Sequence, residues 1–386
     1  MTALPPFPVT MVGSWPRSPE LLRALGEWRR GTMTRARFLE HARAGVRAVL
    51  AAQIEAGVDL VTDGEQTRDN FYSFVAGKLD GVRLMTLAEM LDLVEDKQGF
   101  QRLLDTLDVP AFAIRNPTCV GELRAREPLA ADDLSYLRSL TGQPVKVTLP
   151  GPYLLTRAMW VPEATADVYP DKETLGERVV AILSDEVGRL VRAGADFIQL
   201  DEPVLTELVF TQGRTRTFMC AALAARRDPR EELEFAVGLI TRVLAAAGTV
   251  RTGLHVCRGN WSRDERTLLA GGYAPLAPWF ARLPVRQLVL EYATPRAGPV
   301  IDTGGKELGL GVVNPRIETI ERPEQIRERV VAALARAPAG GLFLNPDCGF
   351  GTFSARPMNT PEVATRKLAA MVSAARTLRD DPPAPS

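Results

Sequence analysis

A histidine and a cysteine separated by one residue, His255 and Cys257, end an apolar run of the sequence. On a β-strand, residues i and i+2 point to the same face, so the imidazole and the thiol converge on one point. Both groups are zinc ligands. Cys348 follows a second apolar run, and Glu291 ends a third. These residue types, each at the carboxyl end of a short buried segment, indicate a metal site.

Core packing is a second interpretation of the same residues. Unpaired cysteine is among the most buried residue types, and a lone histidine more often fills a core than binds a metal. The chain has only two histidines and four cysteines, however, and His255, Cys257 and Cys348 all fall at the ends of apolar runs. The pattern by itself leaves both interpretations open.

The composition narrows the classes of partner. Lys+Arg and Asp+Glu are equal at 47 each, so no overall charge favours nucleic acid or an anionic membrane surface. We therefore expect small molecules or another protein as partners. No segment reaches transmembrane length, and the first residues lack a basic region followed by an apolar stretch. With few cysteines and no secretory signal, the expected location is the cytoplasm.

The elements that must position these residues alternate between strand and helix. Short, nearly continuous apolar runs are typical of parallel strands buried on both faces. They occupy residues 9–12, 58–62, 145–149, 197–200, 252–256, 287–290, 308–312 and 341–344. Eight such runs in one α/β chain predict a closed (β/α)8 barrel.

Helical signals lie between the runs. Apolar residues recur with helical spacing over 175–191, and the helix is expected to stop at Gly194. Pro323 opens another helix, and Thr360 followed by Pro361 predicts an N-cap with proline in the first turn.

We expect one domain over residues 1–386, interrupted by an excursion after the second strand. The stretch 80–142 is too long for a connecting loop, so it should contain a helix and a hairpin around 111–123. The proline-rich tail, 380–386, is expected to be frayed.

Polar residues follow every predicted strand. The strand ends carry Gly13-Ser14, Asp63-Gly64-Glu65, Pro150-Gly151-Pro152, Asp201-Glu202-Pro203, His255 and Cys257, Glu291, Asn314, and Asn345-Pro346-Asp347-Cys348. Buried carboxylates without partners are unfavourable, so core design does not explain this distribution. A single active site at the carboxyl-terminal rim of the barrel does.

These motifs resemble the catalytic, carboxyl-terminal barrel of the cobalamin-independent methionine synthase family, in a short single-barrel form. The resemblance is carried by Val12-Gly13-Ser14-Trp15-Pro16, Asp63-Gly64-Glu65, residues 144–152, Ile198-Gln199-Leu200-Asp201-Glu202-Pro203, His255-Val256-Cys257, Leu290-Glu291 and Asn345-Pro346-Asp347-Cys348-Gly349. It extends from residue 12 to residue 349, which is nearly the whole chain.

The resemblance implies a zinc-dependent methyltransferase that passes a methyl group to a thiol, with homocysteine giving methionine. Its zinc ligands would be His255, Cys257, Glu291 and Cys348, with the substrate thiol as the exchanging ligand. Coordination deprotonates a thiol while leaving its sulfur nucleophilic. Glu291, the harder oxygen ligand, would dissociate to admit that sulfur, which gives it a catalytic role.

The amino-acid part of homocysteine maps onto Ser14, Glu65 and Asp201 by the same resemblance. A substrate ammonium needs acceptor-only partners, which two carboxylates supply. We assign Asp201 a catalytic role as well, and Glu202 a place in the substrate site. A helix cap or a salt bridge to a barrel arginine is the alternative for Asp201 and Glu202. Cys119 and Cys220 match no ligand position and are expected in packing or on the surface.

The methyl donor is the point at which the chain departs from the folate-using members of the family. The segment expected to carry a protonating histidine reads Val313-Asn314-Pro315-Arg316-Ile317, and His41 lies on a predicted outer helix. Trp160 lies near the position of a pterin-stacking tryptophan. The donor is therefore expected to be methyl-tetrahydrofolate or a methylcorrinoid carrier.

An alternative is a zinc thiol alkyltransferase or lyase of the same superfamily that acts on another thiol or electrophile. In that reading Arg316 would meet an anionic group of the substrate. A third class, a metal-binding protein without catalytic activity, is not favoured, because such a protein has no need of a labile glutamate beside two thiolates.

Overall fold

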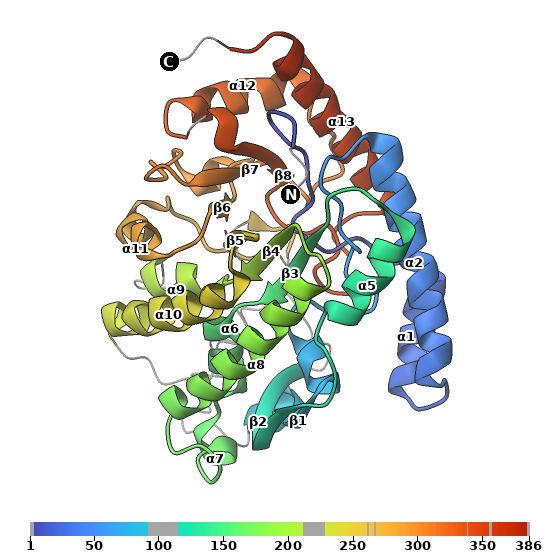
Figure 1. The fold of residues 1–386 in the computed structure, drawn as a ribbon, viewed down its shortest axis with the longest axis vertical. Helices are drawn as coiled ribbons and strands as arrows, with labels where there is room; N and C mark the ends of the chain where they lie inside the picture. The colour runs from blue at the N-terminus through green and yellow to red at the C-terminus, as the bar shows by residue number, and fades with distance from the viewer. Residues whose placement is uncertain are drawn as a thin grey trace.

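The structure is a computed structural model, and it describes residues 4–91, 115–210, 228–260, 262–265, 268–337, 339–354 and 357–383. Its main sheet is parallel and follows the chain order. The strands are β3 (Lys146–Pro150), β4 (Phe197–Asp201), β5 (Arg251–Val256), β6 (Gln287–Leu290), β7 (Glu307–Val313) and β8 (Leu342–Pro346). Figure 1 shows these strands around the centre of the molecule with helices outside them.

Two short extended segments connect the edges of this sheet. Val9 forms a parallel bridge with Leu344 of β8, Thr10 bridges Leu60, and Val61 bridges Val145 at the start of β3. The N–H groups of Thr10 and Leu60 donate to the carbonyls of Leu344 and Val9, at 3.0 and 3.3 Å. The runs predicted at 9–12 and 58–62 therefore take the places of the first two barrel strands, as isolated bridges, and the α/β barrel prediction is confirmed.

The strands of the main sheet are buried, except at Arg251 at the start of β5, because helices cover their outer face and side chains fill the interior. All positions of β3, β4, β6, β7 and β8 are buried. Inside the barrel, Leu60, Phe197 and Phe343 form an apolar cluster. This packing explains why the strands read as continuous apolar runs rather than alternating ones.

Helices pack around the sheet, and several of them begin with local signals in the sequence. The helices are α1 (Pro19–Arg29), α2 (Arg35–Ala56), α3 (Leu87–Leu91), α5 (Ala131–Leu140), α6 (Pro152–Met159), α7 (Pro162–Thr165), α8 (Lys172–Arg192), α9 (Val204–Phe210), α10 (Pro229–Leu244), α11 (Ala277–Arg282), α12 (Pro323–Leu334) and α13 (Pro361–Asp380). Helix α8 ends just before Gly194, and the Thr360 side chain caps α13 by accepting the N–H of Val363. The predicted helix starts at Pro323 and Pro361 are confirmed.

The excursion after the second barrel strand differs from the predicted hairpin. Residues 115–125 form a single strand, β2 (Arg115–Ala125), which pairs antiparallel with β1 (Leu79–Thr86). The partner of 115–125 is thus a distant segment, and a hairpin confined to 111–123 does not form. Residues 92–114 lie outside the described part of the chain.

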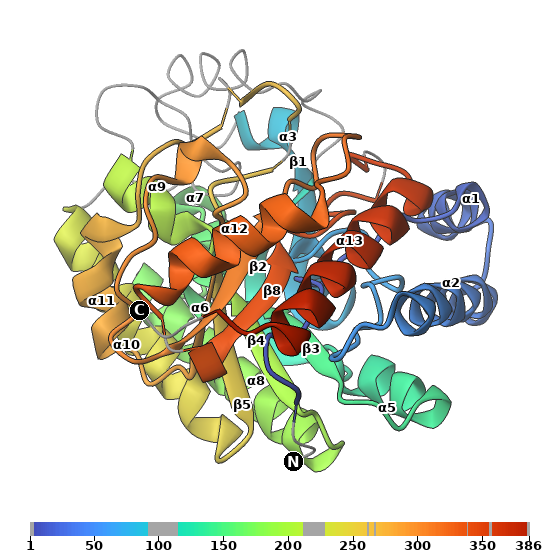
Figure 2. The same ribbon diagram turned by 90° about the horizontal axis from the view of Figure 1, so that it is seen from above.

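Several smaller predictions can be placed on this fold. Cys119 is buried in packing on β2, whereas Cys220 lies outside the described residues. Helices α1 and α2, of which α2 carries His41, lie at one edge of the molecule in both views (Figures 1 and 2). Among the described helices, none is both long enough and apolar enough to cross a bilayer.

Candidate metal centre and adjoining pocket

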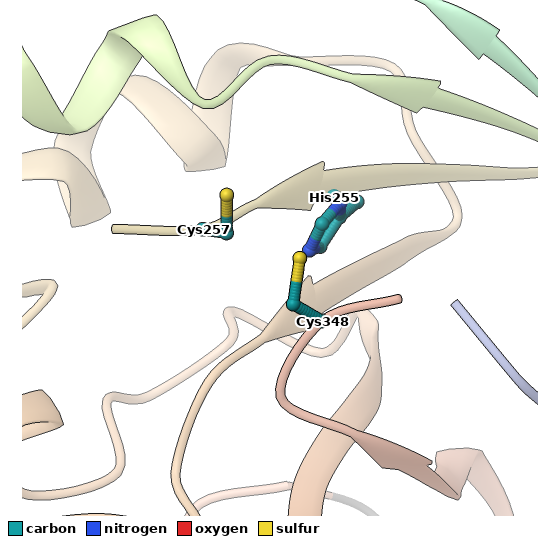
Figure 3. A group of neighbouring side chains, drawn as sticks. All are labelled: His255, Cys257 and Cys348. Carbon is teal, nitrogen blue, oxygen red and sulfur yellow. The ribbon is translucent and has the colours of Figure 1, made fainter. Parts of the chain in front are cut away.

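Three residues from two strand ends form a buried cluster. His255 lies on β5, Cys257 follows it directly, and Cys348 comes shortly after β8. Their ligand atoms all lie within 4.8 Å of one another. Figure 3 shows the imidazole of His255 and the sulfur of Cys348 directed toward each other, with Cys257 beside them. The structure therefore brings together three of the four side chains that the sequence proposed as metal ligands.

A carboxylate orients the histidine of this cluster. Asp201 Oδ1 lies 2.9 Å from His255 Nδ1 and also accepts the Gln199 side-chain amide at 2.8 Å. His255 Nε2 is buried and has no hydrogen-bond partner among the described residues. When Nδ1 donates to Asp201, the neutral ring presents the Nε2 lone pair, an arrangement that recurs in carboxylate–histidine–zinc sites. An unpartnered buried nitrogen beside two sulfurs fits a bound zinc ion.

The cluster is strongly polarised without a metal. A hydrogen bond between the sulfurs raises the pKa of Cys257 well above its ordinary value and lowers the pKa of Cys348 to about 5. Burial lowers the pKa of His255, but the Asp201 carboxylate and the Cys348 thiolate outweigh burial and raise it to about 10. Metal binding needs a neutral imidazole and thiolates, so it must release protons from His255 and Cys257.

A cavity of about 450 Å³, counted with its open mouth, adjoins the cluster. It is lined by Val12, Ser14, Glu65, Phe71, Asp201, Pro203, His255, Cys257, Asn260, Cys348, Gly349, Thr352 and Phe353. Ser14, Glu65 and Asp201, the predicted cage for a substrate amino group, thus share this cavity with the cluster.

Glu65 carries a carboxylate oxygen that is available to a ligand. Its Oε1 accepts the Thr148 hydroxyl at 2.8 Å, whereas its buried Oε2 has no partner within the described residues. Burial raises the pKa of Glu65. The φ of Glu65 is +55°, a region that non-glycine residues seldom occupy. The backbone N–H of Glu65 donates to Asp63 Oδ1 at 2.9 Å, which helps to hold this turn. Such strain is found where a side chain must be aimed at a site.

Glycine permits the loop that follows Cys348 to pass close to Ser14. A Cβ added to Gly349 would lie 2.1 Å from Ser14 Oγ. The Ser14 hydroxyl oxygen accepts the N–H of Gly351 at 3.3 Å, and the Ser14 carbonyl accepts the N–H of Phe350 at 2.9 Å. The first and last strand ends of the barrel are therefore tied together at the pocket.

Glu202 and Trp160 do not line this cavity. Both Glu202 oxygens accept backbone N–H groups, from Tyr153 at 2.7 Å and Leu154 at 2.9 Å. The carboxyl group thus caps the amino terminus of α6, which was the alternative to a substrate contact. Burial raises its pKa to about 8. Trp160 ends α6 and packs against the hydrophobic core.

Glu291 and Arg316 are also engaged elsewhere. Glu291 lies outside the group of three ligand atoms, and its carboxylate accepts hydrogen bonds from Asn260, Arg296 and the backbone of Arg258. The Arg316 guanidinium is buried, donates to Asn260 Oδ1 at 3.1 Å and pairs with Glu265. The structure does not bring either side chain to the lining of the cavity.

Four residues that line the cavity were not predicted from the sequence, and Asp347, predicted only as a polar residue of the rim, has a supporting role. Asn260 lies three positions after Cys257, and this proximity could have drawn attention to it. Phe71, Thr352 and Phe353 come from loops with no local pattern. Asp347 does not line the cavity; its Oδ1 accepts the N–H groups of Tyr292 and Ala293, each at 2.8 Å, and so fixes the backbone after β6.

A buried His–Cys–Cys cluster and free carboxylate oxygens at the carboxyl ends of barrel strands define a barrel enzyme with its chemistry at that rim. The model of the catalytic domain of cobalamin-independent synthases matches residues 7–261 and 297–377. The chain therefore belongs to this family and is a methyltransferase, as its motifs predicted.

Similar proteins agree with this classification. A methionine synthase from Saccharolobus solfataricus is 26% identical over 99% of this chain and 97% of its own length, and one from Pyrococcus abyssi is 29% identical over 98% and 94%. A 5-methyltetrahydropteroyltriglutamate–homocysteine methyltransferase from Burkholderia thailandensis is 27% identical, and the match covers 97% of this chain but 43% of that protein.

The fold also matches a solved structure. A B12-independent methionine synthase from Shewanella sp. W3-18-1, in complex with selenomethionine, superposes with a TM-score of 0.74. The identity is 22%, over 98% of this chain and 99% of the other.

Proposed function

We propose that this protein transfers a methyl group to the thiol of homocysteine, with zinc held by His255, Cys257 and Cys348. The observation that carries the proposal is the buried cluster with an unpartnered Nε2, next to a cavity that contains free carboxylate oxygen. Zinc in such a site would deprotonate the substrate thiol at neutral pH and leave its sulfur nucleophilic. The protein's own residues would orient the metal ligands and the substrate and set the charge around the metal.

The residues divide this work between metal and substrate. Asp201 holds His255 in one ring orientation through its 2.9 Å contact with Nδ1. Glu65 and Asp201 offer carboxylates to the substrate ammonium, and Ser14 adds a hydroxyl at the same cavity. Two thiolates on one metal keep its other ligands electron-rich. We therefore treat Asp201 as a positioning residue for His255 and as part of the substrate cage.

The methyl donor in this proposal is methyl-tetrahydrofolate or a methylcorrinoid carrier. The described residues place no histidine besides His255 in the cavity lining, and Trp160 lies outside it. A protonating histidine of the kind implied for folate-using relatives is thus absent from that lining. Both donor types must be assayed.

The alternative is a zinc thiol alkyltransferase or lyase that acts on another thiol or electrophile, and it was suggested by the missing histidine and by Arg316. The Arg316 guanidinium is paired with Glu265 and bonded to Asn260, and it lies outside the cavity lining. The position of Arg316 therefore gives this alternative no support.

A donor screen tests the proposal. Purified zinc-loaded protein is incubated with homocysteine and, in turn, methyl-tetrahydrofolate with one or several glutamates and a methylcorrinoid. We expect methionine from at least one donor, and none with Cys348→Ser. Absence of methionine with every donor would contradict the proposal.

A further inference from the structure

Arg17 is a buried arginine that lies outside the metal cluster and outside the cavity lining. It follows Ser14 by three residues, and it is 3% exposed. Its Nη1 donates to the carbonyl of Gly351 at 3.0 Å. Its Nη2 donates to the carbonyls of Glu65 and Arg68, at 2.7 and 2.6 Å. The guanidinium is therefore bound to backbone oxygens that come from two other segments of the chain.

These hydrogen bonds join three loops of the rim, and each loop carries part of the cavity lining. Ser14 shares the first loop with Arg17, Glu65 lies on the second loop, and Thr352 lies on the third, after β8. Arginine suits this task because its N–H donors point outward from a rigid, planar fork. Arg17 thus fixes the distance between loops that must together enclose a small molecule.

The carbonyl of Glu65 is the anchored group that matters most for the site, because the backbone is strained at this residue. The φ of Glu65 is +55°. Its N–H donates to Asp63 Oδ1 at 2.9 Å, and its carbonyl accepts both Arg17 Nη2 and the N–H of Arg68. A strained residue persists only where its surroundings hold it on both sides. Held in this way, Glu65 keeps its unpartnered Oε2 at the cavity.

We propose that Arg17 is a positioning residue for the substrate ammonium: it holds the Glu65 turn in the conformation that presents the free carboxylate oxygen to the cavity. Arg17 would not touch the substrate, because both of its Nη groups bind backbone carbonyls and it does not line the cavity. The inference rests on the proposed function, since it requires that Glu65 binds the amino group of homocysteine.

Calorimetric titration of the zinc-loaded protein with two thiols tests the inference. One is homocysteine, and the other is mercaptobutyrate with a terminal thiol, which is homocysteine without its amino group. Arg17→Lys keeps the charge but places its donors on a single nitrogen, which cannot bridge separate carbonyls as the planar fork does. The affinity for homocysteine should fall by about tenfold, which corresponds to one hydrogen bond to a charged group, and the affinity for mercaptobutyrate should not change. Equal losses for the two thiols would overturn the inference, because they would show a general disturbance of the cavity.

A double-mutant cycle shows whether Arg17 acts through Glu65. Glu65→Gln removes the carboxylate that Arg17 positions. When Arg17→Lys is added to Glu65→Gln, the affinity for homocysteine should fall by no more than about twofold further, since the positioned group is already lost. A further tenfold loss would show that Arg17 acts on another part of the cavity, and it would overturn the inference.

Two more variants complete the design. Arg17→Gln is used if Arg17→Lys does not fold, because a neutral amide leaves no buried charge without compensation, and it should show the same selective loss for homocysteine. Arg379→Lys is the matched control. Arg379 also donates to backbone carbonyls, those of Pro6 and Phe7, at 2.8 and 3.2 Å, but these residues precede the first barrel segment. This control should leave both affinities unchanged.

Failure of the proposed function would have a different signature. A zinc-loaded wild type that binds neither thiol would overturn the proposed function, and the role of Glu65 with it. A wild type that binds homocysteine more tightly than mercaptobutyrate, with the same preference in Arg17→Lys, would overturn the role of Arg17 alone.

Discussion

At the scale of single residues, the contact between Asp201 and His255 links the candidate metal ligands to the adjoining cavity. The Asp201 carboxylate accepts from Gln199 and faces His255 Nδ1, so it fixes both the rotation and the tautomer of the ring. In other metal sites, mutation of such a hydrogen-bond partner lowers the metal affinity by about 10–100-fold.

Asp201→Asn should therefore weaken zinc binding by about 10–100-fold, with a parallel loss of methyl transfer. An asparagine can present its side-chain NH2 to Nδ1. Nδ1 would then accept that hydrogen bond, the ring proton would lie on Nε2, and Nε2 would have no lone pair for the metal. The measurement is zinc competition with a chelator. Glu65→Gln is the control, because Glu65 lines the same cavity but has no bond to His255. Equal zinc affinities for the wild type and Asp201→Asn would refute the positioning role.

Glu65 should govern substrate binding rather than metal binding. Its free Oε2 is expected to accept the homocysteine ammonium, and hydrogen bonds to charged groups contribute about 1.5–3 kcal/mol. Glu65→Gln should therefore raise the KM for homocysteine by about 10–100-fold, with a smaller effect on kcat. Steady-state kinetics over a range of homocysteine concentrations measure both. An unchanged KM would remove Glu65 from the substrate site.

The raised pKa of Glu65 also predicts a pH dependence. Burial is the main cause of the rise, so the carboxyl group is protonated at a higher pH than an ordinary glutamate. Below its pKa the group is neutral and cannot pair with the ammonium. The KM for homocysteine should therefore increase as pH falls, beginning above the ordinary glutamate value of about 4.3. Glu65→Gln should lack this acid limb, and a limb of the same shape in both proteins would contradict the assignment.

At the scale of elements, helix α6 depends on Glu202. The two N–H groups that Glu202 accepts, from Tyr153 and Leu154, belong to the first turn of α6 and have no earlier carbonyl to bond. Glu202→Ala should lower the free energy of unfolding by about 1–2 kcal/mol, as loss of a helix cap does, and leave the homocysteine KM unchanged. Denaturant unfolding and kinetics on the same protein measure the two effects. A large rise in KM with unchanged stability would restore Glu202 to the substrate site.

At the scale of the whole molecule, the apolar core lies apart from the candidate metal ligands. One apolar cluster runs from the barrel strands to α8, α10, α12 and α13, and His255, Cys257 and Cys348 are not members of it. The metal would lie at a rim built by loops that follow the strand ends. We therefore expect the metal-free protein to stay folded and to be inactive, unlike a small zinc domain whose folding energy comes from the metal.

Far-UV circular dichroism before and after chelation checks this expectation. The helical signal should be unchanged, and activity should return when zinc is added back. Loss of the helical signal on chelation would show instead that the metal holds the barrel together.

Local pattern was sufficient wherever the determining contact lies within a few residues. The spacing of His255 and Cys257 places both side chains on one side of β5, because strand geometry alone sets that relation. The apolar runs identified the barrel because parallel strands are buried on both faces. The N-cap at Thr360, with Pro361 as the first helical residue, was equally predictable, since a cap bonds to its own first turn.

The partner of each polar side chain could be identified from the folded structure but not from local pattern. Asp201 and Glu202 are neighbours in sequence, yet one faces His255 and the other caps α6, because adjacent strand-end residues point in different directions toward segments about 50 residues away. The Glu291 carboxylate bonds to Arg296, five residues further along the same loop, and to Asn260, which comes from the segment after β5 and is separated from Glu291 by 31 residues. Strand β2 likewise pairs with β1, an earlier part of the excursion, and not with a second strand inside residues 111–123. Local pattern was thus enough to predict the elements and the rim that carries the candidate site. Long-range pairing sets the contacts of each residue there, because hydrogen-bond partners separated by many residues leave no periodic signal in the chain.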